Sequence, residues 1–282
     1  MLGRWARSPK ALVVMLLLLL IALALWRAGP SKTIPQLTLA AAIAVAIDIA
    51  IGLWRRGLTR FPTGGLVTGL MIGMILAPAA SLLAVSVAAA GALASKHLLR
   101  VPRFHLFNPA AAGLLGSLLL VPAAQSWWGS LADLPAPFVL ILLAGGAVVV
   151  WRVNRVPSTL AFFGLYFMAF TAAAMWPGQP SPLLAAVFRP PFLNAAVFFG
   201  FLMLTDPSTS PSRTPEQLTF GAITAIASAI TFMVIHGLHY LFIGLLLANA
   251  WYAWHRTTRS AHFAGDNRPG TGTGQLSVER PL

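Results

Sequence analysis

The most constraining feature of this chain is a succession of long apolar segments separated by short polar turns. They lie near residues 11–26, 36–54, 64–77, 79–95, 104–121, 136–151, 157–176, 187–205, 217–235 and 238–254. A helix that crosses the bilayer needs about 20 apolar residues, and the segments do not alternate apolar and polar residues as membrane strands do. The pattern predicts an all-α polytopic membrane protein with about ten transmembrane helices, forming one domain over residues 1–254.

Composition excludes several other classes of protein. Only 9% of the residues are charged, whereas soluble domains carry about 25% charged residues. The chain has no cysteine, which excludes disulfides, thiolate metal sites and cysteine-ligated iron–sulfur clusters. The formal charge of +13 could indicate nucleic-acid binding, but the basic residues lie in short loops, where membrane topology places them. We therefore expect the lipid bilayer, and no nucleic acid, as a partner.

The distribution of Lys and Arg predicts the orientation of the chain. With ten helices and the N-terminus inside, only Arg27, Lys32 and Arg189 of the 19 basic residues fall in outside loops. An odd number of helices would break this bias. The first apolar segment follows three basic residues and lacks a clean cleavage site, which predicts a retained signal anchor. We expect a multi-pass protein of the bacterial inner membrane with both termini in the cytoplasm, and a disordered tail over 255–282.

Two of the apolar segments resemble each other. The third ends Met74-Ile75-Leu76-Ala77-Pro78, the eighth ends Leu204-Thr205-Asp206-Pro207, and each is followed by a second apolar helix. They are an odd number of helices apart, so the repeats 11–121 and 136–254 would be inverted in the membrane. Inverted halves commonly place the functional site at their interface, beside discontinuous helices. The third segment is short and rich in glycine, which favours a broken or tilted helix.

Two acidic residues are candidates for an ion pathway. Asp206 follows the eighth segment, where Asp and Pro are also ordinary helix-terminating residues. Asp48 lies inside the second segment, and an acid within the membrane usually faces a partner or a cavity. Asp48 is also close enough to Trp54 to reach the membrane interface. Both interpretations remain open for each residue.

Small residues and a capping motif mark further candidates. Asn108-Pro109 opens the fifth segment as an N-cap followed by Pro at the first helical position. The small residues after it, including Gly113, and the pair Gly69 and Gly73 permit close helix packing. They could equally leave room for a planar ligand or for a phosphate close to the backbone. The histidines at 236 and 239 lack an evident third ligand, so we predict no metal site.

Several motifs together resemble a known family. They are Thr63-Gly-Gly-Leu-Val-Thr-Gly-Leu, Lys96, Phe104-His-Leu-Phe-Asn108-Pro-Ala, Trp151-Arg-Val-Asn-Arg-Val-Pro157 and Leu204-Thr-Asp206-Pro-Ser. Their order is similar to that in the membrane D subunit of the Rnf electron-transport complex (RnfD) and the B subunit of the sodium-pumping NADH:quinone oxidoreductase (NqrB). The resemblance covers roughly residues 36–254. It implies a ten-helix bundle of two inverted halves, similar to ammonium and urea channels.

The resemblance also implies a function. Members of this family transfer electrons through flavin while sodium or protons move, together with other membrane subunits of the complex. Many carry FMN on the threonine of a Ser-Gly-Ala-Thr motif, but the corresponding loop 121–135 contains no threonine, and a Gly-Glu element of the family is reduced to Gly145-Gly146. Covalent FMN is therefore not expected. A non-covalent flavin, FMN or riboflavin, is expected beside the residues Gly69, Gly73, Asn108, Gly113, Thr205 and Asp206.

Two alternatives to the electron-transport subunit remain open. The first is an ion or small-solute transporter or channel that uses the same scaffold without redox activity, with Asp48 or Asp206 contacting the ion. The missing threonine favours this alternative. The second is a scaffold subunit that neither binds a cofactor nor conducts.

The predicted topology can be tested with reporter fusions. Fusions at residues 130 and 237 should report the outside, and fusions at 100 and 212 the inside, because the positive-inside bias requires this alternation. Alkaline phosphatase and green fluorescent protein activities measure the two sides. A swap at any of the four positions would contradict the topology.

Overall fold

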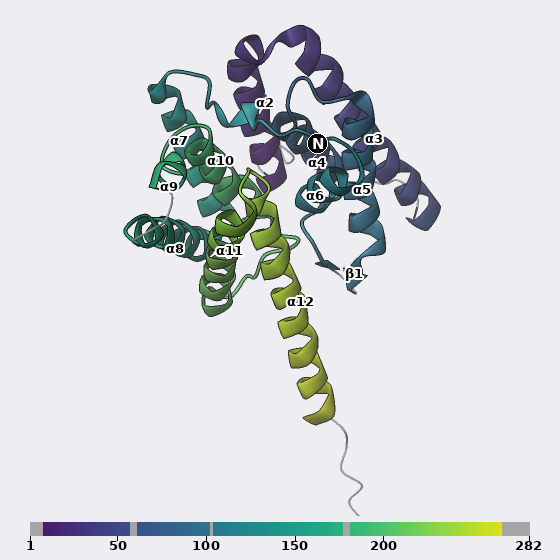
Figure 1. The fold of residues 1–282 in the computed structure, drawn as a ribbon. Coiled ribbons are helices and arrows are strands. Elements are labelled where there is room, and N and C mark those ends of the chain that lie inside the picture. Colours follow the sequence, from purple (N-terminus) through teal and green to yellow (C-terminus); the bar gives the residue numbers. More distant parts are fainter. Residues whose placement is uncertain (1–7, 57–60, 102–103, 177–180, 267–282) are drawn as a thin grey trace, which may run out of the picture.

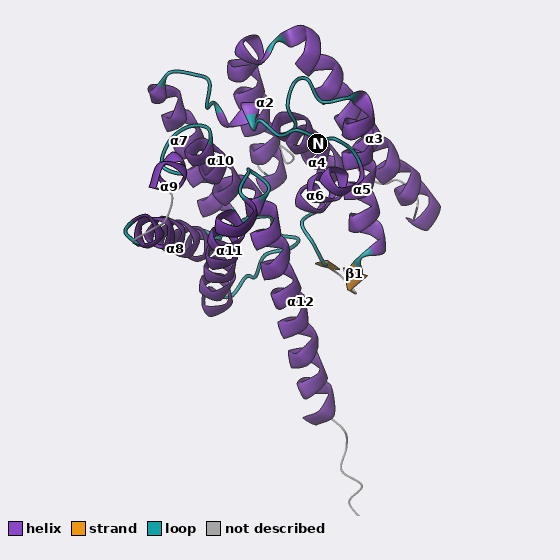
Figure 2. Ribbon diagram, in the orientation of Figure 1, coloured by secondary structure: helices purple, strands orange, loops and turns teal. Residues whose placement is uncertain are grey.

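The computed structural model describes residues 8–56, 61–101, 104–176 and 181–266, and these residues form an all-α fold (Figure 1, Figure 2). The helices are α2 (Pro9–Ala28), α3 (Pro30–Arg56), α4 (Thr63–Ile75), α5 (Leu82–Leu98), α6 (Pro109–Leu120), α7 (Val139–Arg152), α8 (Val156–Ala174), α9 (Ser181–Ala186), α10 (Phe192–Phe198), the π-helical η3 (Phe199–Met203), α11 (Thr214–Ile235) and α12 (Tyr240–Asp266). Two 3₁₀ turns, η1 (Trp128–Ser130) and η2 (Ala136–Phe138), and the strands β1 (Arg100–Val101) and β2 (Phe104–His105) complete the described elements. Every apolar segment of the sequence contains a helix, so the all-α prediction is confirmed.

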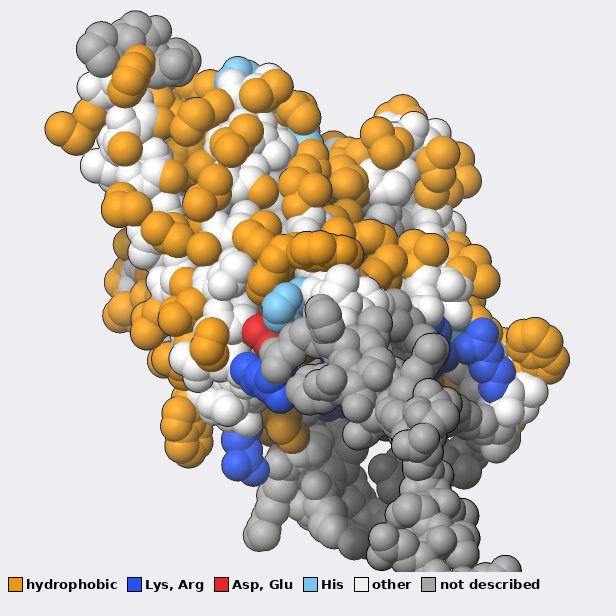
Figure 3. All heavy atoms as spheres, turned by 90° about the horizontal axis from the view of Figure 1, so that it is seen from below, with side chains coloured by type: hydrophobic (Ala, Val, Ile, Leu, Met, Phe, Trp, Pro, Cys, Tyr) orange, Lys and Arg blue, Asp and Glu red, His pale blue; other side chains and the backbone are white. Residues whose placement is uncertain are grey.

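The helices have the length and composition of membrane segments. Helices α2, α3, α8 and α11 are long and apolar enough to cross a membrane, and α4, α5, α6, α7 with η2, and α10 with η3 are shorter apolar helices. Hydrophobic side chains are spread widely over the face seen in Figure 3, and one group of acidic, basic and histidine side chains lies near its centre. Large apolar side chains such as Leu119, Leu120 and Val234 are mostly exposed. These properties indicate a membrane protein.

The helices pack in two groups that follow the sequence. In the first group, drawn purple to blue in Figure 1, α3 packs on α4 and α5, and α5 packs on α6. In the second group, drawn teal to yellow, α11 packs on both α8 and α12. Between the groups, α2 contacts α7 and α6 contacts α12.

Glycines bring the helices of the first group into close contact. A Cβ on Gly69 would lie 2.6 Å from the carbonyl oxygen of Ala40, and one on Gly73 would lie 2.9 Å from Leu37 Cδ2, so α4 lies directly against α3. A Cβ on Gly113 would lie 2.3 Å from the carbonyl oxygen of Ala88, so α6 lies directly against α5. Close packing of small residues therefore explains these three glycines. The glycine faces that we expected to hold a flavin are filled by neighbouring helices.

Helix α4 is a broken helix, as its sequence suggests. It has 13 residues, which span about 20 Å at the usual rise per residue, and it ends before Pro78. Beyond it, Leu76 is extended and bridges Gln125, and the backbone N–H of Trp127 donates to the carbonyl of Ile75. The Gln36 side chain donates to the carbonyls of Gly73 and Leu76 at 2.8 and 3.1 Å. These bonds satisfy the carbonyls that a helix end leaves without partners.

Three boundaries differ from the expected ones. Helix α6 begins only at Pro109, because Phe104 and His105 pair with β1 in a hairpin. Helix α10 begins only at Phe192, directly after Pro190-Pro191, and proline cannot donate the backbone hydrogen bonds of a helix interior. Helix α12 continues to Asp266, into the segment that we expected to be a disordered tail. Residues 267–282 of that segment lie outside the described residues.

The close contact at Gly113 predicts a stability effect. Gly113→Ala should lower the melting temperature in detergent, because overpacking of this kind costs about 1–3 kcal/mol. Gly116→Ala on the same helix is the matched control, since a Cβ there meets no atom within 4 Å. It should leave the melting temperature unchanged or raise it, because alanine favours helix over glycine by about 1 kcal/mol. Equal melting temperatures for the two variants would contradict the proposed packing.

Candidate functional site

A cavity of about 130 Å³ lies where the two groups of helices meet, and its mostly apolar lining includes several charged or titratable side chains. Its walls come from the N-terminal parts of α2, α4 and α6, from the C-terminal ends of α5 and α7, from β2, and from η3 with the segment that follows it. All of these helix ends belong to the side that the sequence assigns to the cytoplasm. The charged and titratable side chains in its lining are Lys10, Lys96, His105 and Asp206.

Asn108 connects the cavity to both groups of helices. Its Oδ1 accepts a hydrogen bond from the backbone N–H of Ala111 at 3.1 Å, which confirms the predicted N-cap of α6. Its Nδ2 donates to the carbonyl of Met203 at 3.2 Å, and its backbone N–H donates to Oδ1 of Asn249 at 2.9 Å. Asn108 therefore holds α6 against the end of η3 and against α12. The Asn-Pro motif and the Thr-Asp-Pro motif, far apart in sequence, meet here.

Asp206 lies at a helix terminus and also lines the cavity. The π-helical η3 ends at Met203, and the chain then turns, with the Asp206 carboxylate accepting the backbone N–H of Ser208 at 3.1 Å. The carbonyl of Asp206 accepts the Ser210 hydroxyl at 2.8 Å. Thr205 also lines the cavity and donates to the carbonyl of Phe201. π-Helical turns inside α-helices occur frequently at functional sites.

A buried arginine of the Trp151–Pro157 motif, which we did not predict as a site residue, holds this turn. The Nε of Arg155 donates to the Ser210 hydroxyl at 2.8 Å, and one terminal nitrogen donates to the carbonyls of Val153 and Asn154. Burial lowers the pKa of Arg155 from its ordinary value, and the nearby charge of Asp206 opposes that shift. An arginine nevertheless stays protonated in proteins. A fixed positive charge therefore stabilises the segment that carries Asp206.

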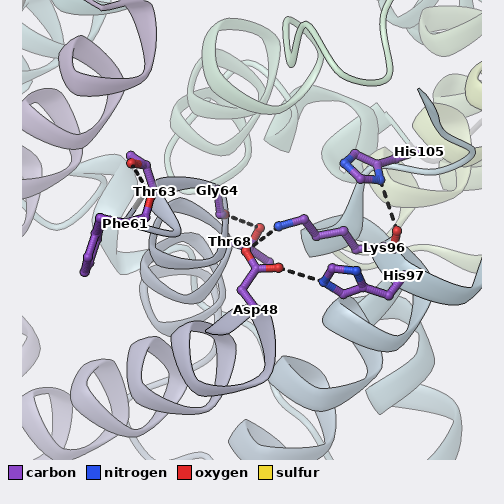
Figure 4. A network of polar contacts seen from close by, with 8 residues as sticks. All are labelled: Asp48, Phe61, Thr63, Gly64, Thr68, Lys96, His97 and His105. Atoms are coloured by element: carbon purple, nitrogen blue, oxygen red, sulfur yellow. Dashed lines mark hydrogen bonds and ion pairs between the residues drawn. The ribbon is translucent and has the colours of Figure 1, made fainter. Parts of the chain in front are cut away.

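Asp48 lies beside the cavity and contacts two basic side chains of α5, Lys96 and His97 (Figure 4). Its Oδ2 is 2.5 Å from the Nζ of Lys96, and its Oδ1 is 2.7 Å from Nε2 of His97. The three side chains are only 8%, 13% and 13% exposed, respectively. A Cβ on Gly65 would lie 2.8 Å from Oδ2, so only glycine leaves room for the carboxylate against α4. The expectation that an acid within the apolar segment faces a partner is met by Lys96 and His97.

His105 links this network to the cavity. Its Nδ1 donates to the carbonyl of Lys96 at 3.0 Å, and its ring lines the cavity. Burial lowers the pKa of His105, the charge of Lys96 lowers it further, and the charge of Asp206 acts in the opposite direction. The imidazole is therefore neutral at pH 7.

The structure brings together part of the expected site. Asn108, Thr205 and Asp206 line one cavity, and Asp48 reaches it through Lys96. The expected glycines at 69, 73 and 113 face other helices instead, for the reason given above. His236 donates from Nδ1 to the carbonyl of Phe232, on the far side of the bundle. Among the described residues, no three histidine or acidic side chains gather as metal ligands would.

Comparison with protein families and with curated proteins finds no match for this chain. The assignment of function therefore depends on the geometry of the cavity and on the motifs of the sequence.

The half-buried His105 predicts a pH dependence of stability. A histidine whose pKa is lower in the folded than in the unfolded protein makes the unfolded state bind more protons, so stability falls as the pH drops below the unfolded pKa of about 6.5. The melting temperature in detergent should fall between pH 7.5 and pH 5.5, and His105→Gln should reduce that fall. The exposed His236→Gln is the control and should behave as the wild type. Identical pH profiles for wild type and His105→Gln would contradict the burial effect.

Proposed function

We propose that this chain is an integral membrane subunit of an electron-transport complex of the RnfD and NqrB kind, in which ions move through the interface of two inverted halves. The observation that carries the proposal is the meeting of the Asn108 and Asp206 segments at one cavity between the two groups of helices. Ends of discontinuous helices and unwound backbone carry the ion sites at repeat interfaces of transporters, and here the end of η3 lies beside Asn108 and Asp206. The inner-membrane location and the cytoplasmic position of both termini belong to the same proposal.

Corresponding helix contacts support the inverted halves. The packing of α3 on α5 and of α5 on α6 corresponds to the packing of α8 on α11 and of α11 on α12. Gly113 is the fifth residue of α6 and Gly244 the fifth of α12. A Cβ on Gly244 would lie 2.6 Å from the carbonyl oxygen of Thr224 in α11, just as Gly113 meets Ala88 in α5. In the proposed inverted halves, α4 would correspond to α10 with η3, and the bundle would have ten membrane segments.

The volume of the cavity bears on whether it holds an ion or a flavin. Pockets for cofactor-sized ligands have volumes of about 300–1,000 Å³, whereas this cavity has about 130 Å³. It has room for an ion and several water molecules, each of which needs about 10–15 Å³ of such space. The small volume favours an ion over a whole flavin at this cavity. We therefore assign ion movement to the cavity, and a flavin would be held elsewhere on the subunit or against partner subunits.

The same observation favours a second candidate function. A small cavity with charged side chains between inverted halves suits an ion or small-solute transporter without redox activity. The loop 121–135, which lacks the threonine that would carry FMN, supports this candidate as well.

Purification from native membranes discriminates between the two candidates. The electron-transport subunit should be yellow, because flavin supplies the redox chemistry, and it should co-purify with other membrane subunits. A colourless protein that purifies alone and transports a solute in liposomes would support the transporter and contradict the electron-transport role.

Asp206 provides a test that applies to both candidates. Asp206→Ala should abolish ion movement while the protein still inserts into the membrane, because the substitution removes the only carboxylate in the described cavity lining. Asp133→Ala, in the loop on the opposite side, is the control and should keep activity. Full activity of Asp206→Ala would show that the cavity is not the functional site.

A further inference from the structure

The cavity and the loop between α6 and α7 lie at opposite ends of the same short helix. The N-terminal part of α4 lines the cavity, from Gly64 to Met71. The C-terminal end of α4 is covered by residues 125–131, which we call the plug segment and which contain the 3₁₀ turn η1. In the topology that the sequence predicts, the cavity lies on the cytoplasmic side and the plug segment on the outside.

The plug segment is inserted between helices of both groups. Its two tryptophans, Trp127 and Trp128, are only 1% and 2% exposed. The indole Nε1 of Trp128 donates to the carbonyl of Gly73 on α4 at 2.9 Å. The ring of Trp127 stacks on Phe242 of α12, with the ring centroids 5.3 Å apart. The turn η1 also packs on α2 and α10, so the segment fills the outer end of the interface between the groups.

Only about one helical turn separates the cavity from the plug segment. On α4, Met71 lines the cavity, whereas the Cε of Met74 lies 2.5 Å from where a Cβ on Gly129 would be. On α10 with η3, Leu202 lines the cavity, whereas Phe198 packs edge-to-face on the first tryptophan of the plug segment. One helical turn rises about 5 Å. The side chains of this thin layer are apolar and buried, and apolar constrictions gate pores by excluding water.

The plug segment is held in an unfavourable conformation. Trp127 and Leu131, which flank η1, have φ angles of 54° and 63°, in the left-handed region that bulky residues rarely adopt. Such residues persist only where contacts hold them, and they occur at switch regions. Three buried atoms, Gln125 Nε2, Ser126 Oγ and Ser130 Oγ, have no hydrogen-bond partner among the described residues. Withdrawal of the segment would relax the backbone and expose these groups to water.

We propose that the plug segment is the outer gate of the path between the two groups of helices, and that the structure shows the state closed to the outside. When the segment withdraws, the C-terminal end of α4 becomes accessible from the outside. This inference rests on the proposed function and deepens it by naming the segment that controls access.

Chemical labelling measures the opening directly, because the chain has no cysteine of its own. Met74→Cys places a single thiol beneath the plug segment, where the wild-type side chain is fully buried. Ala229→Cys is the matched control, because Ala229 is also buried but lies on α11, which packs on α8 and α12. The full-length variants are labelled in intact spheroplasts with a membrane-impermeant maleimide. Melting temperatures establish that each variant is folded.

Met74→Cys should be labelled from the outside faster than Ala229→Cys. Adding Trp127→Ala should raise the labelling rate of Met74→Cys about tenfold, because labelling by local opening follows the population of the open state. Trp176→Ala removes a ring that is 70% exposed and should leave the rate unchanged. If Met74→Cys is labelled no faster than Ala229→Cys, or if Trp127→Ala does not change its rate, the segment is a fixed cap and the gate is overturned.

An engineered disulfide tests whether the opening is required for ion movement. Leu76 and Gln125 face each other in an antiparallel bridge that is flanked by two backbone hydrogen bonds. The Cα atoms of such a pair are about 4.5 Å apart, a separation that a disulfide spans. Oxidation of the double variant Leu76→Cys/Gln125→Cys should therefore lock the plug segment to the end of α4, and a reductant should release it.

Ion flux is measured in phosphatidylcholine and phosphatidylglycerol vesicles under a potassium diffusion potential, with tracer sodium and a pH-sensitive dye as probes. Flux through the oxidised double variant should fall to that of empty vesicles and should return after reduction. Equal flux in the oxidised and reduced forms would overturn the gate while leaving the proposed function intact. Wild-type vesicles that move neither probe would contradict the proposed ion movement, whereas the labelling of Met74→Cys decides separately whether the segment opens.

Discussion

The rest of the structure depends on one constraint, that backbone polar groups within an apolar bundle must find partners inside the protein. Two helices stop short, and each end is satisfied by side-chain amides. At the end of α4 the donor is Gln36, and at the end of η3 it is Asn108, which is itself held by Asn249. These buried amides fix where the helices break. Because the break at η3 opens beside the first turns of α2, α4 and α6, the constraint also determines where this cavity can exist.

The charged side chains of this region are held by nearby acidic or hydrogen-bonding groups. Lys96 is neutralised by Asp48, and the buried Arg155 is held by Ser210 and backbone carbonyls close to Asp206. An unpaired charge in an apolar interior is costly, so each pairing restricts the chain to one arrangement. Gly65 is part of the same balance, since any side chain there would displace the Asp48 carboxylate. The residues that pack the helices therefore also position the groups that carry charge.

The cavity is small and its charges are mixed, which suits an ion better than a flat cofactor. A flavin beside Gly69, Gly73 and Gly113 is less favoured than the sequence suggested, because these glycines pack against Ala40, Leu37 and Ala88. The proposed ion movement rests on the size and the charges of this cavity. The proposed redox role depends on the resemblance of the motifs. The visible absorbance of the purified protein, which reports bound flavin, tests it.

The sequence by itself determined the all-α class, the approximate place of each apolar helix, the N-cap at Asn108 and the end of α4 before Pro78, because length, hydropathy and capping are local properties. It did not determine which helix faces meet. In a soluble protein an apolar stripe marks the buried face of a helix, but here the faces toward lipid and toward protein are both apolar. Only the tertiary structure could therefore decide that Gly69 and Gly113 face helices, that Asp48 pairs with Lys96 and His97, and that Arg155 holds the Asp206 turn.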